Sequence, residues 1–205
     1  ANNVGAISDV AIRSGDGQGV AGVDMTRAWP GPCLVKNLHV HGFDVGIDIA
    51  HGEYGPTFEN LVLSGQRVAG LRLGGNVITV HNLVSSNTVP AVLVTGGSSH
   101  LILLGATCLG GSSANAAVQL GAGHCYVRGL SCAGYVAAIG GSANVSGPTV
   151  AEYHTGAKDE LFPSPDASLQ LPIAETPARV DNLIANWRRA EIVNYSDGGN
   201  RALWQ

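Results

Sequence analysis

The sequence predicts an all-β protein, a right-handed, single-stranded parallel β-helix of about six coils that is followed by an extended C-terminal connector. Three observations support this fold class: similar strings recur at a nearly constant interval, apolar residues alternate with other residues inside each string, and glycine is abundant. The chain has 205 residues, of which 29 are glycine, and only 13% of its residues are charged. This composition suits a solenoid with small corners and stacked apolar columns.

The recurring strings are NLHVHGFDVGIDI at 37–49, NLVLSGQRVAGLRL at 60–73 and NLVSSNTVPAVLV at 82–94. Each begins with Asn-Leu and ends with apolar residues at alternate positions, and the period of roughly 22 to 24 residues is typical of solenoids. Alignment predicts three stacked columns, Leu38-Leu61-Leu83, Ile47-Leu71-Val92 and Ile49-Leu73-Val94, with an earlier and less regular copy at Val10, Val23 and Met25.

Each copy reads as two short strands rather than a helix. Ile47-Asp48-Ile49 and Leu71-Arg72-Leu73 alternate with a period of two, which is typical of strands. Glycine-bearing corners leave no room for a helix of about ten residues. A leucine-rich repeat has a similar length, but its fixed leucine ladder is absent from this chain. A parallel β-helix, with each copy forming one coil, therefore fits better.

The register also predicts rows of polar residues. Asn37, Asn60 and Asn82 stand at the strand entrances, where asparagine can adopt a corner conformation and bond its copies above and below. We expect them to be structural. Two outward columns follow from the alternation, Asp24-Asp48-Arg72 and Lys36-Glu59-His81. Either column could be a solvent-facing ladder of charges, or its carboxylates could perturb one another's pKa or share a cation.

The four cysteines are Cys33, Cys108, Cys125 and Cys132. Cys108 and Cys132 lie about one coil apart and could stack at a distance that a disulfide allows. We favour four reduced, buried packing residues and leave the state of this pair open. No CxxC spacing points to zinc, and His39 and His41 point outward without a third ligand, so we expect no metal site and no cofactor.

Composition argues against two classes of partner. The net charge of −4 and the scattered arginines give no basic stripe of the kind a nucleic-acid-binding protein shows. The apolar stretch at 101–106 is too short to span a membrane.

The first residues already read as strand and turn rather than as a signal peptide. A coil without a capping helix at the start predicts that the chain belongs to a longer protein.

The corners after two consecutive coils carry the candidate site. The strings TRAWPGP at 26–32 and AHGEYGP at 50–56 both end in Gly-Pro. Aromatic faces beside charged and hydrogen-bonding groups are what a sugar chain requires, so we expect Arg27, Trp29, His51, Tyr54 and Asp24 to bind substrate. The alternative is that Trp29 and Tyr54 fold down over the solenoid edge.

Carboxylates limit where catalysis could occur. None lies between Glu59 and Glu152, so the middle coils offer only neutral groups such as Ser85, Ser86 and Asn87, which we place on the strand faces. Glu53 is the preferred acid candidate, because partial burial beside Tyr54 would raise its pKa. Asp48 is the expected ionised partner.

The repeat stops near residue 148, and the composition then changes. We expect β-helix coils over 1–150, a proline-rich connector over 151–180, and the start of a following module or a packing tail over 181–205. The connector ELFPSPDASLQLPIAETP at 160–177 has too many prolines for a regular helix or a central strand.

The coils from SDVAIRSGDGQGVAGVDMTRAWPGPC to GYVAAI, followed by the LFPSP and LPIAETP connector, resemble the pectate-lyase-like β-helix family of secreted carbohydrate-active proteins. The arrangement is similar to the tandem two-β-helix exo-β-1,3-glucanases, in which a second β-helix follows the connector. The NYSDGGNRALWQ tail matches that family's Asp-Gly turn at Asp197-Gly198, but lacks its acidic, threonine-rich cluster.

The resemblance implies a secreted or cell-surface protein that acts on a polysaccharide as a glycoside hydrolase or polysaccharide lyase. It also implies that the main catalytic carboxyls lie outside this chain, with a second β-helix module or a neighbouring subunit on the C-terminal side. Fold alone does not determine chemistry, so two alternatives stay open: a non-catalytic glycan-binding or surface-display module, and a structural spike or assembly subunit.

Overall fold

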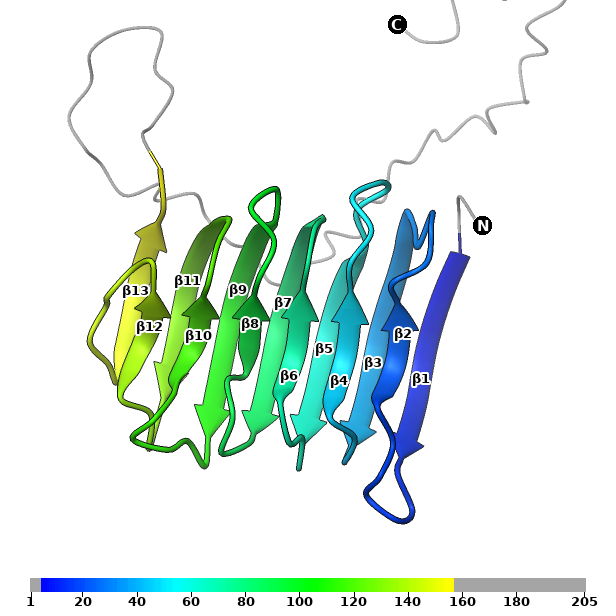
Figure 1. Cartoon of the computed structure of the whole chain (residues 1–205), viewed down its shortest axis with the longest axis horizontal. Helices are drawn as coiled ribbons and strands as arrows, with labels where there is room; N and C mark the ends of the chain where they lie inside the picture. Colours follow the sequence, from blue (N-terminus) through cyan, green and yellow to red (C-terminus); the bar gives the residue numbers. More distant parts are fainter. Residues whose placement is uncertain (1–4, 157–205) are drawn as a thin grey trace, which may run out of the picture. The chain divides into compact units, whose positions relative to one another are not determined.

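The computed structural model describes residues 5–156, which form a parallel β-solenoid of about five turns (Figure 1). Six successive strand pairs contribute alternately to a seven-stranded and a six-stranded sheet, and these described residues contain no helix. The all-β solenoid prediction is confirmed, and the expected number of coils is close. The strands are β1 (Gly5–Arg13), β2 (Ala21–Met25), β3 (Cys33–His41), β4 (Val45–Ile49), β5 (Thr57–Ser64), β6 (Ala69–Leu73), β7 (Val77–Ser86), β8 (Val92–Val94), β9 (His100–Leu109), β10 (Ala116–Leu120), β11 (His124–Cys132), β12 (Ala137–Gly141) and β13 (Thr149–His154).

The predicted apolar columns are in register and form the core between the two sheets. Leu38 pairs with Leu61, and Leu61 pairs with Leu83. These three side chains are at most 1% exposed. The two columns in the six-stranded sheet are likewise paired and buried. Burial of a leucine side chain contributes about 1.5–3 kcal/mol, so each column is a principal source of stability.

A left-handed residue bends each of the first six strands of the seven-stranded sheet. The predicted asparagine ladder stands at this bend: Asn60 Nδ2 donates to Asn37 Oδ1 at 2.9 Å, and Asn82 Nδ2 donates to Asn60 Oδ1 at 3.0 Å. Asn37 Nδ2 in turn donates to Asp9 Oδ1 at 2.7 Å, so an aspartate begins the ladder. The bend residues and their φ angles are Asp9 (58°), Asn37 (52°), Asn60 (56°), Asn82 (59°), Gly105 (70°) and Gly129 (66°).

A buried polar cluster stabilises the corner between the two sheets. Ser86 is exposed on β7, as expected, but Ser85 and Asn87 are 0% and 3% exposed, so the expectation that they lie on an outer strand face is wrong. Asn87 Nδ2 donates to Ser85 Oγ at 3.0 Å and to Gln66 Oε1 at 2.8 Å. The Tyr135 hydroxyl donates to the carbonyl oxygen of Asn87 at 3.0 Å. Because each of these buried groups has a hydrogen-bond partner, the cluster orders the corner without leaving a buried polar group unsatisfied.

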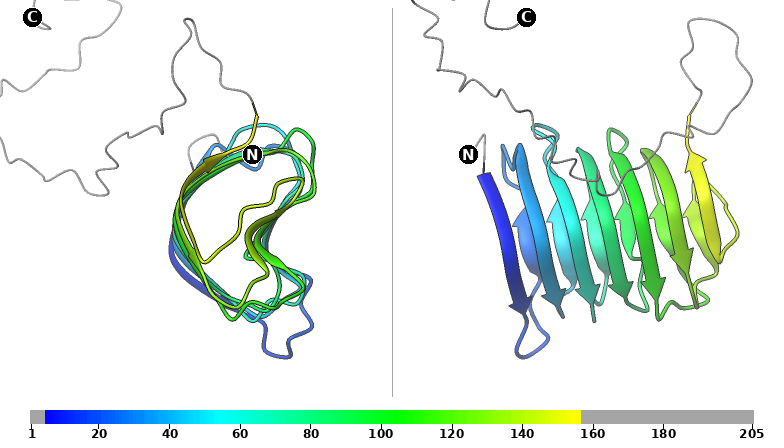
Figure 2. Two further views of the ribbon diagram at one scale, coloured as in Figure 1. Left: turned by 90° about the vertical axis from the view of Figure 1, so that its left-hand side faces the viewer. Right: turned by 180° about the vertical axis from the view of Figure 1, so that it is seen from behind.

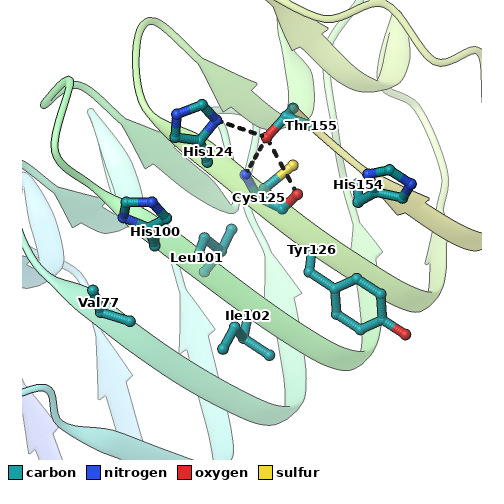
Figure 3. Close-up of a pocket in the computed structure, with 9 residues that line it drawn as sticks. All are labelled: Val77, His100, Leu101, Ile102, His124, Cys125, Tyr126, His154 and Thr155. Atoms are coloured by element: carbon teal, nitrogen blue, oxygen red, sulfur yellow. Dashed lines mark hydrogen bonds between the residues drawn. The ribbon is translucent and has the colours of Figure 1, made fainter. Parts of the chain in front are cut away.

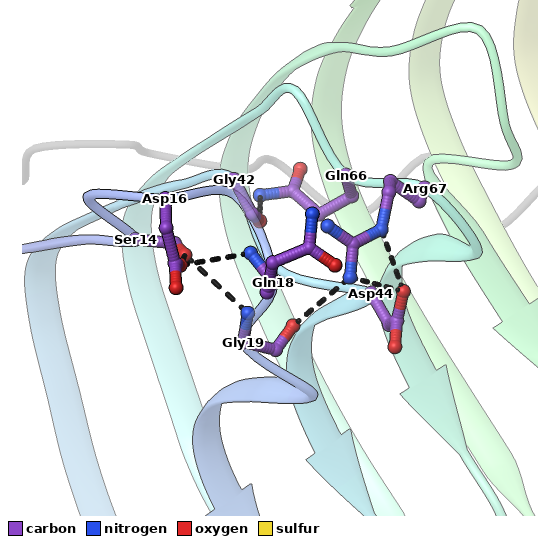
Figure 4. A network of polar contacts seen from close by, with 8 residues as sticks. All are labelled: Ser14, Asp16, Gln18, Gly19, Gly42, Asp44, Gln66 and Arg67. Atoms are coloured by element: carbon purple, nitrogen blue, oxygen red, sulfur yellow. Dashed lines mark hydrogen bonds and ion pairs between the residues drawn. The ribbon is translucent and has the colours of Figure 1, made fainter.

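The same corner extends outward to the first coil (Figure 4). Arg67 forms an ion pair with Asp44 at 2.7 Å, and one guanidinium nitrogen donates to the carbonyl oxygen of Gly19. Asp16 accepts hydrogen bonds from the Ser14 hydroxyl and the Gln18 amide. These contacts fix the long loop between β1 and β2 against the following coils.

The C-terminal end of the solenoid departs from the regular repeat. Strand β13 pairs with β11 antiparallel, unlike the other neighbours in its sheet. The segment 142–148 crosses the same end (Figure 2), where Val145 bonds Ile139 through its backbone and packs against the core. Strand β13 ends at His154, beyond the boundary expected at residue 150. Most of the connector and the whole 181–205 segment lie outside the described residues.

Candidate functional site

The predicted substrate-binding corners lie side by side at one edge of the solenoid. The loop 26–32 follows β2, and the loop 50–56 follows β4, its neighbour in the six-stranded sheet. Trp29 is 53% exposed and Tyr54 is 48% exposed, so neither ring folds down over the edge. Both residues have left-handed backbones, with φ of 62° and 60°, which is unusual for bulky side chains. The loops therefore present two aromatic rings to solvent.

Close packing of glycines holds the two loops together. A Cβ atom at Gly31 would lie 2.4 Å from the carbonyl oxygen of Tyr54. One at Gly55 would lie 2.3 Å from the carbonyl oxygen of Val77, on the next coil. Only glycine permits this backbone approach. The aromatic rings consequently project from a rigid stack rather than from independent loops.

The side chain of Asn76 holds the loop 50–56 in place through its backbone. This side chain is 2% exposed, and its Nδ2 donates to the carbonyl oxygen of His51 at 2.6 Å and to that of Glu53 at 3.4 Å. Its Oδ1 accepts from the Val77 amide at 2.7 Å. A buried amide that uses its donor and acceptor groups in this way defines the path of the loop.

The expected environment of the acid candidate is wrong. Glu53 is exposed rather than partly buried, because its loop projects beyond the strands. Asp48 is buried at 7% exposure and forms a two-bond ion pair with Arg72, in which Nε–Oδ1 is 2.8 Å. Its hydrogen bond to Asp48 raises the pKa of Arg72. The Asp48 carboxylate is therefore engaged in the coil-to-coil column and is not free beside Glu53.

The other members of the candidate site share the same edge. Arg27 is exposed on the first loop, and His51 is half-buried on the second. Asp24 pairs with Asp48 in register, as predicted, but its carboxylate accepts hydrogen bonds from the Thr26 hydroxyl at 2.7 Å and the Thr26 amide at 2.9 Å. These bonds lower the pKa of Asp24. The structure thus brings all seven predicted residues to two loops and two adjoining strands.

In the second outward column, the first two residues form an ion pair. Lys36 Nζ lies 3.1 Å from Glu59 Oε1, and His81 follows in register on the next coil. The buried Nε2 atom of His81 has no hydrogen-bond partner among the described residues. Lys36 and Glu59 of this column lie on β3 and β5, the strands of the seven-stranded sheet that follow the two aromatic loops.

Carboxylates in the described residues are engaged with other groups. Glu53 is the exception, since its carboxylate has no hydrogen-bond or ion-pair partner there. The engaged carboxylates, with their partners, are Asp9 (Asn37), Asp16 (Ser14 and Gln18), Asp24 (Thr26), Asp44 (Arg67), Asp48 (Arg72), Glu59 (Lys36) and Glu152 (Tyr126).

A histidine-lined groove, missed from the sequence, lies on the outer face of the seven-stranded sheet (Figure 3). Its volume is about 330 Å³, and the rings of His100 and His124 are 5.1 Å apart. The hydroxyl of Thr155, the residue after β13, forms hydrogen bonds with the backbone amide of Cys125 and with the Nδ1 atom of His124. The 24-residue spacing of the two histidines equals one coil, so the repeat period could have revealed the pair. Within 5–156, no group of three His, Cys, Asp or Glu residues could hold a metal ion.

The cysteines are free thiols in the structure. Cys108 pairs in register with Cys132, as the repeat predicted, and Cys108, Cys125 and Cys132 are buried. Burial, with a smaller effect of Cys132, raises the pKa of Cys108 to about 12. Burial also raises the pKa of Cys125 to about 11. At neutral pH both are thus protonated packing residues rather than nucleophiles.

In comparisons with known proteins, no family model, curated protein or solved structure matches the chain. Over the described residues, no helix long and apolar enough to cross a membrane is found. The resemblance to carbohydrate-active β-helices therefore stays a prediction from the sequence. The candidate site depends on its own geometry.

Proposed function

We propose that this chain is a glycan-binding β-solenoid module of a secreted or cell-surface, polysaccharide-active protein. The single observation that supports it most is the exposure of Trp29 and Tyr54 on neighbouring, rigidly stacked loops. Aromatic faces bind the apolar C–H face of a sugar ring, and a preorganised pair loses little conformational entropy on binding. Arg27 and Glu53, exposed beside them, supply groups that bond sugar hydroxyls.

The engagement of carboxylates favours binding over catalysis. Glycosidases need two carboxyl groups on either side of the scissile bond, one of which commonly has a raised pKa. At this edge Asp48 is paired with Arg72 and Asp24 is bonded by Thr26. Glu53 is exposed on the loop 50–56. A catalytic role for this edge is the second candidate, supported by the unengaged Glu53 carboxylate.

A panel of β-glucans and pectins, assayed for both binding and release of reducing sugar, tests the proposal. We expect wild type to bind at least one polysaccharide and release none. Trp29→Ala should lose binding, whereas Glu53→Gln should retain most of it. Release by wild type that Glu53→Gln abolishes would instead establish the enzyme. Absence of both binding and release on the whole panel would contradict the proposed function and leave a structural role.

A further inference from the structure

Two histidines on neighbouring coils hold their rings side by side in the groove on the seven-stranded sheet (Figure 3). His100 is the first residue of β9 and His124 is the first residue of β11, and the two residues pair in register. Both are exposed, and their ring centroids are 5.1 Å apart with the ring planes inclined at 32°. Among the described residues that line the groove, none is lysine or arginine. The groove therefore presents two accessible imidazoles at a defined separation, without a fixed positive charge between them.

Contacts at Nδ1 determine which nitrogen of each ring carries the proton. His100 Nδ1 lies 3.2 Å from the carbonyl oxygen of Ser98, which can only accept, so this Nδ1 is the donor. The Thr155 hydroxyl donates its single proton to the carbonyl oxygen of Cys125, so His124 Nδ1 donates to that hydroxyl, 3.4 Å away. In a neutral imidazole the other nitrogen then carries a lone pair. Both Nε2 atoms are thus available as ligands.

This arrangement is the one that metal-binding histidines use. A ligating imidazole coordinates through one nitrogen and donates from the other to an oxygen acceptor, which fixes its tautomer and orientation. The ring separation also suits a single ion. Zinc–nitrogen bonds are about 2.0–2.1 Å and the ring centre lies roughly 1.1 Å beyond the nitrogen, so imidazoles on one ion with centroids 5.1 Å apart subtend an angle of about 105° at that ion. This angle is close to the tetrahedral value of about 109°.

The donor atoms select the class of metal. Imidazole nitrogen suits Zn²⁺, Cu²⁺ and Ni²⁺, whereas Ca²⁺ and Mg²⁺ require several oxygen ligands. Cys125, the residue after His124, is buried in the core cluster and faces away from the groove side of β11. Over residues 5–156, no third His, Cys, Asp or Glu completes a group that could hold a metal. Water, or a donor atom of a bound molecule, must therefore supply the remaining ligands.

We propose that His100 and His124 bind one divalent transition-metal ion of the zinc and copper class through their Nε2 atoms. The ion joins β9 to β11 and keeps exchangeable positions toward the open groove. The expectation of no metal site was drawn from His39 and His41, which lie on a single strand, whereas this pair comes from two neighbouring coils. The site is independent of the proposed glycan binding, because its ligands lie on later coils than the loops 26–32 and 50–56.

Calorimetric titration of the full chain with Zn²⁺ alone, at neutral pH, gives the first test. Wild type should bind one ion, and His100→Asn and His124→Asn should each weaken binding tenfold or more, because a single imidazole cannot chelate. His39→Asn, which removes an exposed histidine from β3, is the matched control and should stay within about twofold of wild type. Absence of Zn²⁺ binding by wild type, or a loss in His39→Asn as large as in the other two variants, would overturn the proposal.

Electron paramagnetic resonance of the Cu²⁺ complex tests the ligand set itself. We expect two coordinated imidazole nitrogens in wild type and no more than one in His100→Asn or His124→Asn. Both side chains are exposed, so the circular dichroism spectra of the variants should match that of wild type and exclude unfolding as the cause. A Cu²⁺ spectrum that neither substitution changes would contradict the site.

Discussion

The α-carbon of Gly31 packs so close to the carbonyl oxygen of Tyr54 that a Cβ atom there would lie 2.4 Å from it. This contact joins the loop that carries Trp29 to the loop that carries Tyr54. The spacing of the two exposed rings is thereby set by backbone packing rather than by a direct contact between the rings. The candidate site depends on this glycine more than on any charged residue.

Gly31→Ala should therefore lower both stability and glycan affinity. The added methyl group meets backbone, which cannot rotate away, and overpacking of this kind costs about 1–3 kcal/mol. Chemical denaturation and binding titrations measure the two effects. Gly97→Ala is the matched control, since no atom lies within 4 Å of a Cβ at that position. Equal stability of the two variants would show that the loops are not packed as described.

Leu61→Asp should unfold the chain. Leu61 is 0% exposed in the middle of its column, and an unpaired buried charge costs several kcal/mol. Arg67→Ala should be mild, because the Arg67–Asp44 ion pair is substantially exposed and such pairs contribute about 0–1 kcal/mol. Circular dichroism during thermal unfolding compares them. Similar melting temperatures would mean that the inward and outward faces are assigned incorrectly.

Replacement of Asn60 separates two contributions of the ladder. Asn60→Ala loses both side-chain hydrogen bonds and must adopt a φ of 56°, whereas Asn60→Gly loses the bonds but adopts that φ without strain. We expect the alanine variant to be less stable than the glycine variant by about 1 kcal/mol, and both to be less stable than wild type. Urea denaturation provides the values. An alanine variant as stable as the glycine variant would exclude backbone strain at this bend.

Much of the fold could be predicted from the sequence because a parallel solenoid repeats its environment at a fixed interval. Leu38, Leu61 and Leu83 occupy equivalent positions, so a period of two inside a period of roughly 22 to 24 residues placed them correctly. The start of the ladder at Asp9 was missed, since an aspartate breaks the Asn-Leu signature. The antiparallel β13 was also missed, because the repeat ends before it.

The candidate site was predictable in position but not in chemistry. Repeated Gly-Pro endings located the two loops that carry Trp29 and Tyr54. Whether a loop residue such as Glu53 is buried depends on how far the loop projects, and no periodic signal reports that. Alternation placed Ser85 correctly on the strand but not its inward orientation, because a serine that bonds Asn87 replaces an apolar residue in the column.

Cys108 should make the protein less stable at alkaline pH. Burial raises its pKa from the ordinary 9.0 to about 12. Because the folded pKa lies above the unfolded value, this contribution to stability is complete below pH 9 and is lost as the pH rises toward 12. Urea denaturation between pH 8 and about 10.5 should show a decline that is shallower in Cys108→Val. An identical decline in both proteins would contradict the burial of this thiol.

The affinity of the two-ring edge for a polysaccharide tests the central claim most directly. Isothermal titration calorimetry should compare wild type, Trp29→Ala, Tyr54→Ala and Tyr54→Phe on the glycan that wild type binds, with Val136→Ala as an exposed control. We predict that each alanine variant loses about tenfold or more in affinity, since a stacked ring contributes about 1.5–3 kcal/mol, while Tyr54→Phe and the control stay within about twofold. Unchanged affinity in Trp29→Ala and Tyr54→Ala, with melting temperatures equal to wild type, would contradict glycan binding at this edge.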